Sequence, residues 1–330
     1  MYPEKVLVTG ATGLLGSNIA AELLHRGYEV RVLLRKSSNP IALKGLDVEL
    51  FYGDITNAID INAAAQGCNI IIHSAANTSQ WGLESHLHDA VNIQGTQNVL
   101  NAVKKWGIER FVHVSTANMF RPGSRTQPGD ETGSFSYTKL RTDYIDTKNR
   151  AQQLVLESVK NENIPAIVVN PTFMIGARDA KPSSGKMVLY YLKTPLVICP
   201  TGGKNFVPVQ DVAVGAVNAA ARGRIGECYL LAGENLTYQE FFKKINAVTG
   251  RTKPFFTAPS ALLKTAGHAG DAISKLLGKR IPLSYTNTSM LTIDNYYTPQ
   301  KAITELAMPQ TPIEQAIKEA VNWFAQNGYC

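Results

Sequence analysis

Three glycines spaced three residues apart near the start of the chain constrain its fold more than any other feature. Gly10, Gly13 and Gly16 follow an apolar run at residues 6–8, and such a run is typical of a strand buried on both faces. After the glycines, apolar residues recur at helical spacing, namely Leu15, Ile19, Leu23 and Leu24. Together, the strand, the glycine turn and the helix predict the first half of a βαβ unit that binds a dinucleotide.

Each glycine has a separate role in such a turn. Gly10 lets the chain turn sharply, Gly13 lets the backbone approach a pyrophosphate, and Gly16 lets the helix pack close to the strand. The helix N-terminus then offers unpaired N–H groups and a partial positive charge to the phosphates. The spacing is one residue longer at its first step than the best-known fingerprint, so an ordinary βα turn is the alternative.

The end of the second predicted strand indicates which dinucleotide is bound. Residues 29–34 are predicted as a strand, and Arg35 and Lys36 follow them. In dinucleotide-binding folds, an acidic residue about 20 positions past the glycine turn binds the ribose 2′-hydroxyl, whereas an arginine there accommodates a 2′-phosphate. We therefore predict NADP as the cofactor and leave NAD open. A solvated basic turn is the alternative interpretation of Arg35.

Later strands place polar and small residues at the same edge of the predicted sheet. Strands are expected at residues 48–53, 69–73 and 111–114. Asp54 and Ile55 follow the first of these and would lie beside the adenine, although a carboxylate there could also cap the next helix. Ala75 and Ala76 follow the next strand, and their small side chains would let a cofactor pass close to the backbone.

Length, composition and charge limit the class of protein. A chain of 330 residues has a prior of roughly two domains, and 44% hydrophobic residues suffice for a large core. The net charge of +7 suits a phosphate-bearing cofactor, but without a basic stripe it does not indicate nucleic-acid binding. We therefore expect a small-molecule substrate as the partner and leave a homodimer open.

The cysteines, histidines and apolar runs bear on metal sites and location. The four cysteines are scattered and show no Cys-x-x-Cys spacing, so neither a disulfide scaffold nor a zinc site is expected. His86 and His88 lack nearby residues that would complete a metal site. No apolar run approaches the roughly 20 residues that span a membrane, and we expect no signal peptide because the first predicted strand begins within a few residues of the start. We expect a cytoplasmic protein.

A tyrosine and a lysine on one predicted helix carry the chemistry. Tyr144 and Lys148 are four residues apart, so their side chains are neighbours on one helix face. A phenol has a reference pKa near 10, which is too high for efficient acid–base work at neutral pH. An ammonium beside it is expected to lower that pKa, and the same lysine could hold the ribose hydroxyls of a cofactor. A hydroxyl after the fifth strand would bind the substrate oxygen.

Several motifs, in this order, resemble the extended short-chain dehydrogenase/reductases, and most of all the branch that holds dihydroflavonol reductases and the NAD-dependent epimerase/dehydratases. The motifs are residues 9–16, Asp54-Ile55, residues 73–76, residues 114–117, residues 144–148, residues 170–176 and residues 206–213. The resemblance covers about residues 5 to 232. It implies a doubly wound parallel α/β sheet of the Rossmann type, with a smaller and mostly helical C-terminal substrate lobe.

The resemblance also implies roles for individual residues. Tyr144 would be the general acid in the reduction direction, and Lys148 would tune the phenol and bind the ribose. Thr116 would be the catalytic hydroxyl, with Ser115 as the neighbouring alternative. The remaining cofactor contacts would come from the glycine turn, the adenine end and the nicotinamide end, namely Gly10, Thr12, Gly13, Leu14, Leu15, Gly16, Arg35, Asp54, Ile55, Ala75, Ala76, Pro171 and Thr172.

Two departures favour a reductase over an epimerase. Sugar-nucleotide epimerases usually continue past the catalytic hydroxyl into a Tyr-Gly pair, where this chain has Met119-Phe120-Arg121. They also tend to hold NAD through an acidic residue where this chain has Arg35. We predict an NADP(H)-dependent oxidoreductase that reduces an aldehyde or ketone, or runs the reverse reaction. A nucleotide-sugar epimerase or dehydratase with NAD and a non-catalytic dinucleotide sensor are the alternatives.

We expect the nucleotide-binding domain at residues 1–176, continued by 207–232, and the substrate lobe at residues 177–206 and 233–330. A helix at residues 210–222 and a strand at 228–232 would return to the sheet. The lobe is predicted to be loop-rich up to residue 208, apart from a helix at 187–193, and mainly helical after 237, with helices at 238–249, 260–277 and 312–327.

Aromatic and apolar residues near the nicotinamide end could line an apolar substrate pocket, or could simply pack in the core. The candidates are Trp81, Phe173, Met174 and Phe206. Between residues 260 and 280, lysines and an arginine interleave with leucines and isoleucine. A helix that packs on the lobe with one solvated face is expected there, and an amphipathic helix at a membrane surface is the alternative.

Overall fold

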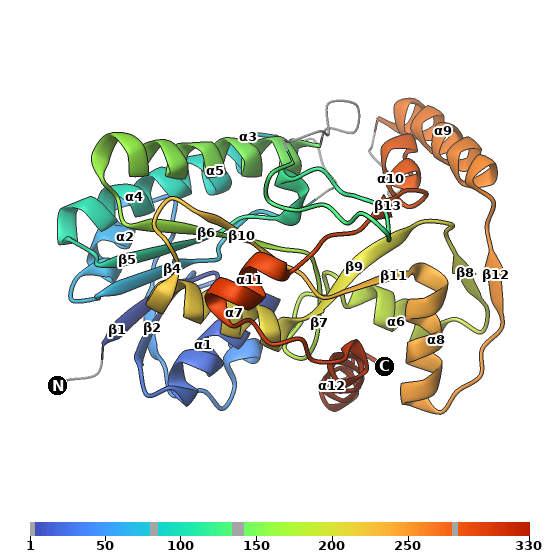
Figure 1. Cartoon of the computed structure of the whole chain (residues 1–330), viewed down its shortest axis with the longest axis horizontal. Helices are drawn as coiled ribbons and strands as arrows, with labels where there is room; N and C mark the ends of the chain where they lie inside the picture. Colours follow the sequence, from blue (N-terminus) through green and yellow to red (C-terminus); the bar gives the residue numbers. More distant parts are fainter. Residues whose placement is uncertain (1–3, 80–84, 134–141, 279–282) are drawn as a thin grey trace.

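The computed structural model describes residues 4–79, 85–133, 142–278 and 283–330. Its centre is a parallel sheet of seven strands in the order β10-β6-β5-β4-β1-β2-β3 (Figure 1). The strands of this sheet are β1 (Lys5–Thr9), β2 (Glu29–Leu34), β3 (Glu49–Tyr52), β4 (Ile70–His73), β5 (Arg110–Val114), β6 (Ala166–Pro171) and β10 (Cys228–Leu231). Strand order reverses between β1 and β4, and in such doubly wound folds the ligand crevice lies at this reversal.

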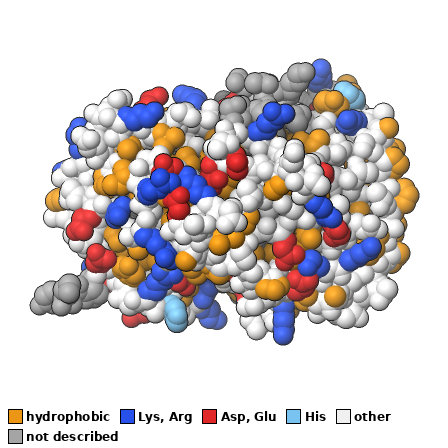
Figure 2. All heavy atoms as spheres, in the orientation of Figure 1, with side chains coloured by type: hydrophobic (Ala, Val, Ile, Leu, Met, Phe, Trp, Pro, Cys, Tyr) orange, Lys and Arg blue, Asp and Glu red, His pale blue; other side chains and the backbone are white. Residues whose placement is uncertain are grey.

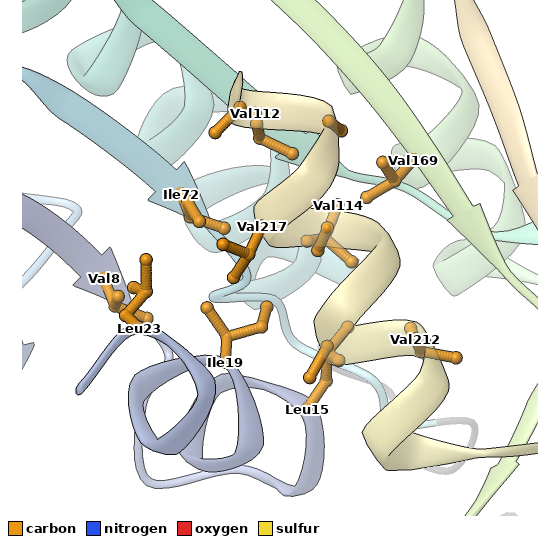
Figure 3. Packing of buried hydrophobic residues seen from close by; sticks show 14 of the residues in the cluster. Val8, Leu15, Ile19, Leu23, Ile72, Val112, Val114, Val169, Val212 and Val217 are labelled. Carbon is orange, nitrogen blue, oxygen red and sulfur yellow. The ribbon is translucent and has the colours of Figure 1, made fainter. Parts of the chain in front are cut away.

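Helices cover both faces of the sheet, because every central strand is apolar on both sides. One face carries α1 (Leu14–His25) and α7 (Val209–Arg222); the other carries α2 (Ala58–Ala65), α4 (Gly95–Trp106) and α5 (Asp143–Glu162). Figure 3 shows the first of these layers, where Ile19 and Leu23 of α1 and Val217 of α7 meet the strand side chains Val8 and Ile72. This packing fixes the N-terminus of α1 beside the end of β1.

A second unit follows the nucleotide-binding sheet and has short strands of its own. In it, β9 (Gly203–Pro208) pairs with β7 (Phe173–Ile175), β11 (Glu234–Thr237) and β13 (Asp294–Asn295), and β12 (Phe255–Thr257) pairs with β8 (Val197–Cys199). The helices of this lobe are α6 (Lys186–Lys193), α8 (Tyr238–Thr249), α9 (Ser260–Leu277), α10 (Tyr285–Met290) and α12 (Ile313–Gln326). Figure 1 places α9 and α10 at the end of the molecule farthest from β1.

Short linking elements complete the chain. A 3-10 turn, η1 (Pro40–Leu43), follows β2; α3 (Ser85–His88) leads into a π-helical turn, η2 (Asp89–Gln94), and η3 (Ala117–Met119) follows β5. Helix α11 (Gln300–Leu306) packs on α7 and so joins the last part of the chain to the nucleotide-binding unit. None of the helices that the structure describes is both long and apolar enough to cross a bilayer.

The expected elements are found, with differences in the lobe. The predicted helices at 238–249 and 260–277 coincide with α8 and α9, and α7 and β10 return to the main sheet as expected. The loop-rich stretch before residue 208, however, contains β8 and β9, and β9 pairs within the lobe rather than with the main sheet. The mainly helical stretch also contains β12 and β13. These strands have two to six residues, which is too few for an alternation of apolar and polar residues to stand out in the sequence.

Candidate active site

The glycine turn after β1 has a backbone that tolerates no larger residue at two of its three glycines. Gly10 adopts a left-handed φ of 73°, and a Cβ there would lie 2.6 Å from the backbone nitrogen of Ala75. A Cβ on Gly16 would lie 2.4 Å from the carbonyl oxygen of Gly10. The turn, β4 and α1 therefore pack backbone against backbone, which is the close approach that the sequence predicts.

Gly13, the remaining glycine of the turn, is not packed against neighbouring backbone and faces outward. It is exposed, and a Cβ on it would meet only the Gly10 carbonyl oxygen, at 3.3 Å. Gly13 is also the N-cap of α1, and no side chain caps this helix or places an acidic group in its first turn. Leu14 and Leu15 bury their side chains in the core, so they could offer a phosphate only their backbone N–H groups. An uncapped helix N-terminus beside an open glycine suits a pyrophosphate.

Arg35 and Asp54, the two charged residues expected near the adenosine half of the cofactor, differ in whether their side chains have partners. Arg35 is exposed just after β2 and makes no ion pair in the described part of the chain. Asp54 accepts hydrogen bonds from the backbone N–H and the hydroxyl of Thr56, both at 2.9 Å, while Asn57 caps α2. Ile55 is buried, and its carbonyl accepts from Asn98. Asp54 thus stabilises the turn with Thr56 and does not cap α2. Its carboxylate still has free lone pairs that could accept from an adenine amine.

The side chains expected to be catalytic come from the turn after β5 and from α5. Thr116 caps the short η3 turn after β5 and is buried, and its side chain lies close enough to the phenol of Tyr144 to lower the pKa of that phenol. Lys148, one turn along α5, is buried and donates from Nζ to the carbonyl oxygen of Val114 at 2.6 Å. Thr142 caps the N-terminus of α5 and so fixes where this helix begins.

Burial, and not the neighbouring amine, dominates the pKa of the phenol. Burial raises the pKa of Tyr144 above its ordinary value of 10.0, and the hydrogen bond with Thr116 opposes this only in part. Burial also lowers the pKa of Lys148 to about 7. The sequence-based expectation that the ammonium lowers the phenol pKa is therefore wrong for this structure. The amine is itself desolvated and close to losing its charge, so it stabilises a phenolate weakly.

A layer of buried polar side chains lies beneath these residues and was not predicted. His73 of β4 and His113 of β5 pair in register, with ring centroids 5.5 Å apart. His73 shares a hydrogen bond of 2.7 Å with Thr9, whereas neither ring nitrogen of His113 has a protein partner among the described residues. Burial lowers the pKa of His73 to about 3, so this imidazole is neutral at pH 7. Two histidines at inward positions of apolar strands were the sequence signal for this layer.

The same layer continues to β6 and supports Thr116. Asn170 donates to the carbonyl oxygens of Thr116, at 2.9 Å, and of the Gln152 side chain, at 2.8 Å. The Oγ of Ser115 and the Oδ1 of Asn170 are buried without a partner in the described residues, and such groups are normally satisfied by internal water. Of the two neighbouring hydroxyls, only that of Thr116 interacts with the phenol of Tyr144 among the described residues.

The residues expected to border the nicotinamide lie where β6 ends and β7 begins. Pro171 ends β6, and Thr172 donates from Oγ1 to Asn205 at 2.7 Å. Phe173 follows, and the amine of Lys204 lies 5.2 Å from the centroid of its ring. Burial lowers the pKa of Lys204 to about 8, and this half-buried lysine has no carboxylate partner in the part of the chain that the structure describes. Sequence reasoning missed Lys204, because a single lysine in a short strand carries no periodic signal.

The candidate pocket residues differ in how deeply the structure buries them. Phe206 is fully buried and stacks on Phe241 with ring centroids 4.1 Å apart, so it packs in the core, which was the alternative to a pocket wall. Met174 is half-buried and packs against the core of the nucleotide-binding unit. Phe173 is half-buried beside Phe206. Trp81 lies outside the described residues.

No group of three or more His, Cys, Asp or Glu side chains that could hold a metal ion occurs among the described residues. The residues that are present do fit a dinucleotide. The features that fit it lie along the carboxyl edge of the sheet. They are the outward-facing Gly13, the uncapped N-terminus of α1, the exposed Arg35 without an ion pair in the described residues, and the buried amine of Lys148.

Comparisons with known proteins agree with this geometry. Residues 6–232 match the model of the NAD dependent epimerase/dehydratase family. A protein of Synechocystis sp. named "Putative dihydroflavonol 4-reductase" is 33% identical over 98% of this chain and 95% of its own length. Sterol demethylase protein B of Methylococcus capsulatus is 31% identical over 98% of both chains. The crystal structure of gox2253 matches with a TM-score of 0.86 and 31% identity, over 98% of this chain and 99% of that one. The chain therefore belongs to the NAD-dependent epimerase/dehydratase family and is an NAD(P)-dependent enzyme of the extended short-chain dehydrogenase/reductase type.

Proposed function

We propose that this enzyme is an NADP(H)-dependent reductase that interconverts a carbonyl group and an alcohol. The proximity of the Thr116 side chain to the phenol of Tyr144, close enough to lower the pKa of that phenol, carries this proposal, because it places two hydroxyls where one carbonyl oxygen could accept from both. The names of the dihydroflavonol reductase and sterol demethylase relatives support redox chemistry on an oxygen-bearing ring. When bound, the nicotinamide supplies or accepts the hydride.

The raised pKa of the phenol suits the reduction direction. Because burial raises the pKa of Tyr144, the hydroxyl keeps its proton throughout the neutral range and can give it to a developing alkoxide. Thr116 then donates to the same oxygen and holds it in place. The reverse direction needs the phenolate, which this environment disfavours.

Lys148 acts by position. Its amine is anchored to the Val114 carbonyl and, with a pKa of about 7, is partly charged at neutral pH. An amine donates to the ribose hydroxyls whether or not it carries the extra proton. We propose that Lys148 orients the ribose and that Pro171 and Thr172 border the nicotinamide.

The preference for NADP rests on Arg35. The side chain is exposed directly after β2, has no carboxylate partner in the described residues, and stands where a 2′-phosphate is held in this fold. A guanidinium pairs with a phosphate through two parallel hydrogen bonds, which an unphosphorylated ribose cannot match. The carboxylate of Asp54 lies next to the adenine in this arrangement.

An NAD-dependent epimerase or dehydratase is the second candidate, and the matching family model favours it. Such an enzyme returns its hydride to the substrate, so it would keep its cofactor through purification and consume none. A reductase releases oxidised cofactor at every turnover. Following NADPH absorbance with steroidal ketones and dihydroflavonols therefore separates the two: steady consumption supports the reductase, and sugar conversion without consumption would replace it.

Cofactor choice is tested by titrating NADPH and NADH separately into the wild type and Arg35→Ala. We expect the wild type to bind NADPH at least about tenfold more tightly, since charge-assisted bonds are worth roughly 1.5–3 kcal/mol. Arg35→Ala should bind both cofactors equally. Lys160→Ala, which removes an exposed cation on α5, is the matched control and should keep the preference. Equal affinities in the wild type would contradict the NADP assignment.

A further inference from the structure

Helix α9 has an apolar face that none of the described elements covers. Its buried face meets α10 through Gly267 and Gly270, where a Cβ would collide with Thr288 and with the Leu283 carbonyl. Next to this face, other side chains of α9 are apolar yet exposed. They are Leu262 (54% exposed), Ile273 (46%), Leu276 (86%) and Leu277 (59%). At 3.6 residues per turn these four fall on one stripe.

A small sheet beside the start of α9 also exposes apolar side chains. Ile198 of β8 pairs with Phe256 of β12, and both are about half exposed. The hydroxyl of Thr201 hydrogen-bonds that of Ser260 at 2.8 Å, so the first turn of α9 is tied to the chain that leaves β8. We call this surface the lobe margin, defined by Leu196, Ile198, Phe256, Leu262, Ile273, Leu276 and Leu277. Figure 2 shows hydrophobic side chains along this end of the molecule.

The positive charge of the chain is concentrated in the same segment. Residues 251–283 hold one acidic residue, Asp271, and six basic ones, namely Arg251, Lys253, Lys264, Lys275, Lys279 and Arg280. That is +5 of the net +7 of the whole chain. Lys264 and Lys275 are exposed on α9 and make no ion pair among the described residues. At 3.6 residues per turn these two lysines lie on the side of α9 opposite the apolar stripe, so the helix has an apolar face and a basic polar face.

We propose that the lobe margin docks on the surface of an anionic lipid bilayer, with α9 lying in the plane of the interface. An amphipathic helix with an apolar stripe and a basic polar face binds in this way: the apolar side chains enter the headgroup region, and the negative surface potential of the anionic lipids attracts the cations of the polar face. A second copy of the chain would bring two segments of +5 together, and this repulsion opposes self-association. The proposal does not depend on the reaction, so lipid binding is measurable without a substrate.

The first test measures binding of the whole chain to vesicles of phosphatidylcholine, with and without phosphatidylglycerol. We expect the wild type to bind the anionic vesicles at least about tenfold more tightly, and added salt to weaken that binding. Lys264→Gln/Lys275→Gln should lose most of the difference between the two lipids. Equal binding to both vesicles, or none to either, would overturn the proposal.

The second test addresses the apolar stripe. Ile273→Glu/Leu276→Glu places two carboxylates on exposed positions, so the variant should fold and bind NADPH as the wild type does while vesicle binding falls at least about tenfold. Ile225→Glu, at a residue 50% exposed in the turn after α7, is the matched control and should keep vesicle binding. Unchanged vesicle binding by the double variant would overturn the proposal. So would sedimentation showing a wild-type dimer that the double variant dissociates, because the margin would then be a self-interface.

Discussion

The Nζ of Lys148 lies 2.6 Å from the carbonyl oxygen of Val114, the last residue of β5. This bond ties α5 to the end of the strand from which Thr116 follows, and it brings Tyr144, one helical turn earlier, beside that hydroxyl. The proposed chemistry therefore depends on one contact between a strand and a helix. Because the amine is buried, the same contact makes the fold sensitive to pH.

Replacing Lys148 should change how stability depends on pH. Burial lowers the pKa of Lys148 from 10.5 to about 7, so between these values the unfolded chain binds a proton that the folded chain has released. The contribution of this residue to the free energy of unfolding thus rises with pH across that window, by up to about 1.4 kcal/mol per pH unit. In Lys148→Met this slope should be missing, whereas Lys160→Met should keep it. Denaturant unfolding at a series of pH values measures it, and parallel curves for Lys148→Met and wild type would contradict the assignment.

The two directions of the reaction should respond oppositely to pH. Reduction uses the protonated phenol, whose pKa is raised by burial, so its rate should stay level through neutral pH and fall only in strong alkali. Alcohol oxidation uses the phenolate and should rise with pH over the same alkaline range. Profiles of kcat/KM in both directions test this. An oxidation rate that is already maximal at neutral pH would show that the phenol pKa is lowered instead.

Gly13 and Gly16 should separate cofactor binding from folding. A methyl group on Gly13 meets only one backbone oxygen, at 3.3 Å, so Gly13→Ala should unfold at nearly the wild-type temperature and yet bind NADPH at least about tenfold more weakly. A methyl group on Gly16 would press into the Gly10 carbonyl, at 2.4 Å, so Gly16→Ala should lose stability as well. Thermal unfolding combined with cofactor titration checks both. Tight NADPH binding by Gly13→Ala would mean that the pyrophosphate lies elsewhere.

Lys204 should contribute to substrate binding and not to cofactor binding. Its amine stands over the Phe173 ring without a carboxylate partner in the described residues, and a half-buried cation of this kind is available to an oxygen of the substrate. Lys204→Met should therefore raise KM roughly tenfold, leave the NADPH affinity unchanged and lower kcat little. Lys193→Met, at an exposed position in α6, is the control. A weakened NADPH affinity in Lys204→Met would move this residue to the cofactor site.

The sequence predicts the nucleotide-binding half well, because its elements carry strong local signals. The glycine turn, the apolar strands and the four-residue spacing of Tyr144 and Lys148 each follow from period and spacing, and α8 and α9 coincide with the predicted ranges. The short strands β8, β12 and β13 form only through pairing with distant segments, so no local pattern reports them.

Side-chain environments were less predictable than elements. Spacing places Lys148 beside Tyr144, but only the packed structure shows that burial outweighs the amine in setting the phenol pKa. Phe206 lies two residues after Lys204 in the sequence, yet its side chain stacks on Phe241 in the core of the lobe. The polar layer of His113 and Asn170 likewise requires the register of β5 and β6.

Hydride transfer from bound NADPH, followed in a single turnover by wild type and Tyr144→Phe, tests the central proposal most directly. The removed hydroxyl is the proposed proton donor, so Tyr144→Phe should transfer hydride about 10²–10⁴-fold more slowly, while its NADPH affinity stays unchanged. Tyr52→Phe, at an exposed residue of β3, should match the wild type. If Tyr144→Phe transfers hydride within a few-fold of the wild-type rate, the phenol is not the acid and the proposed site is wrong.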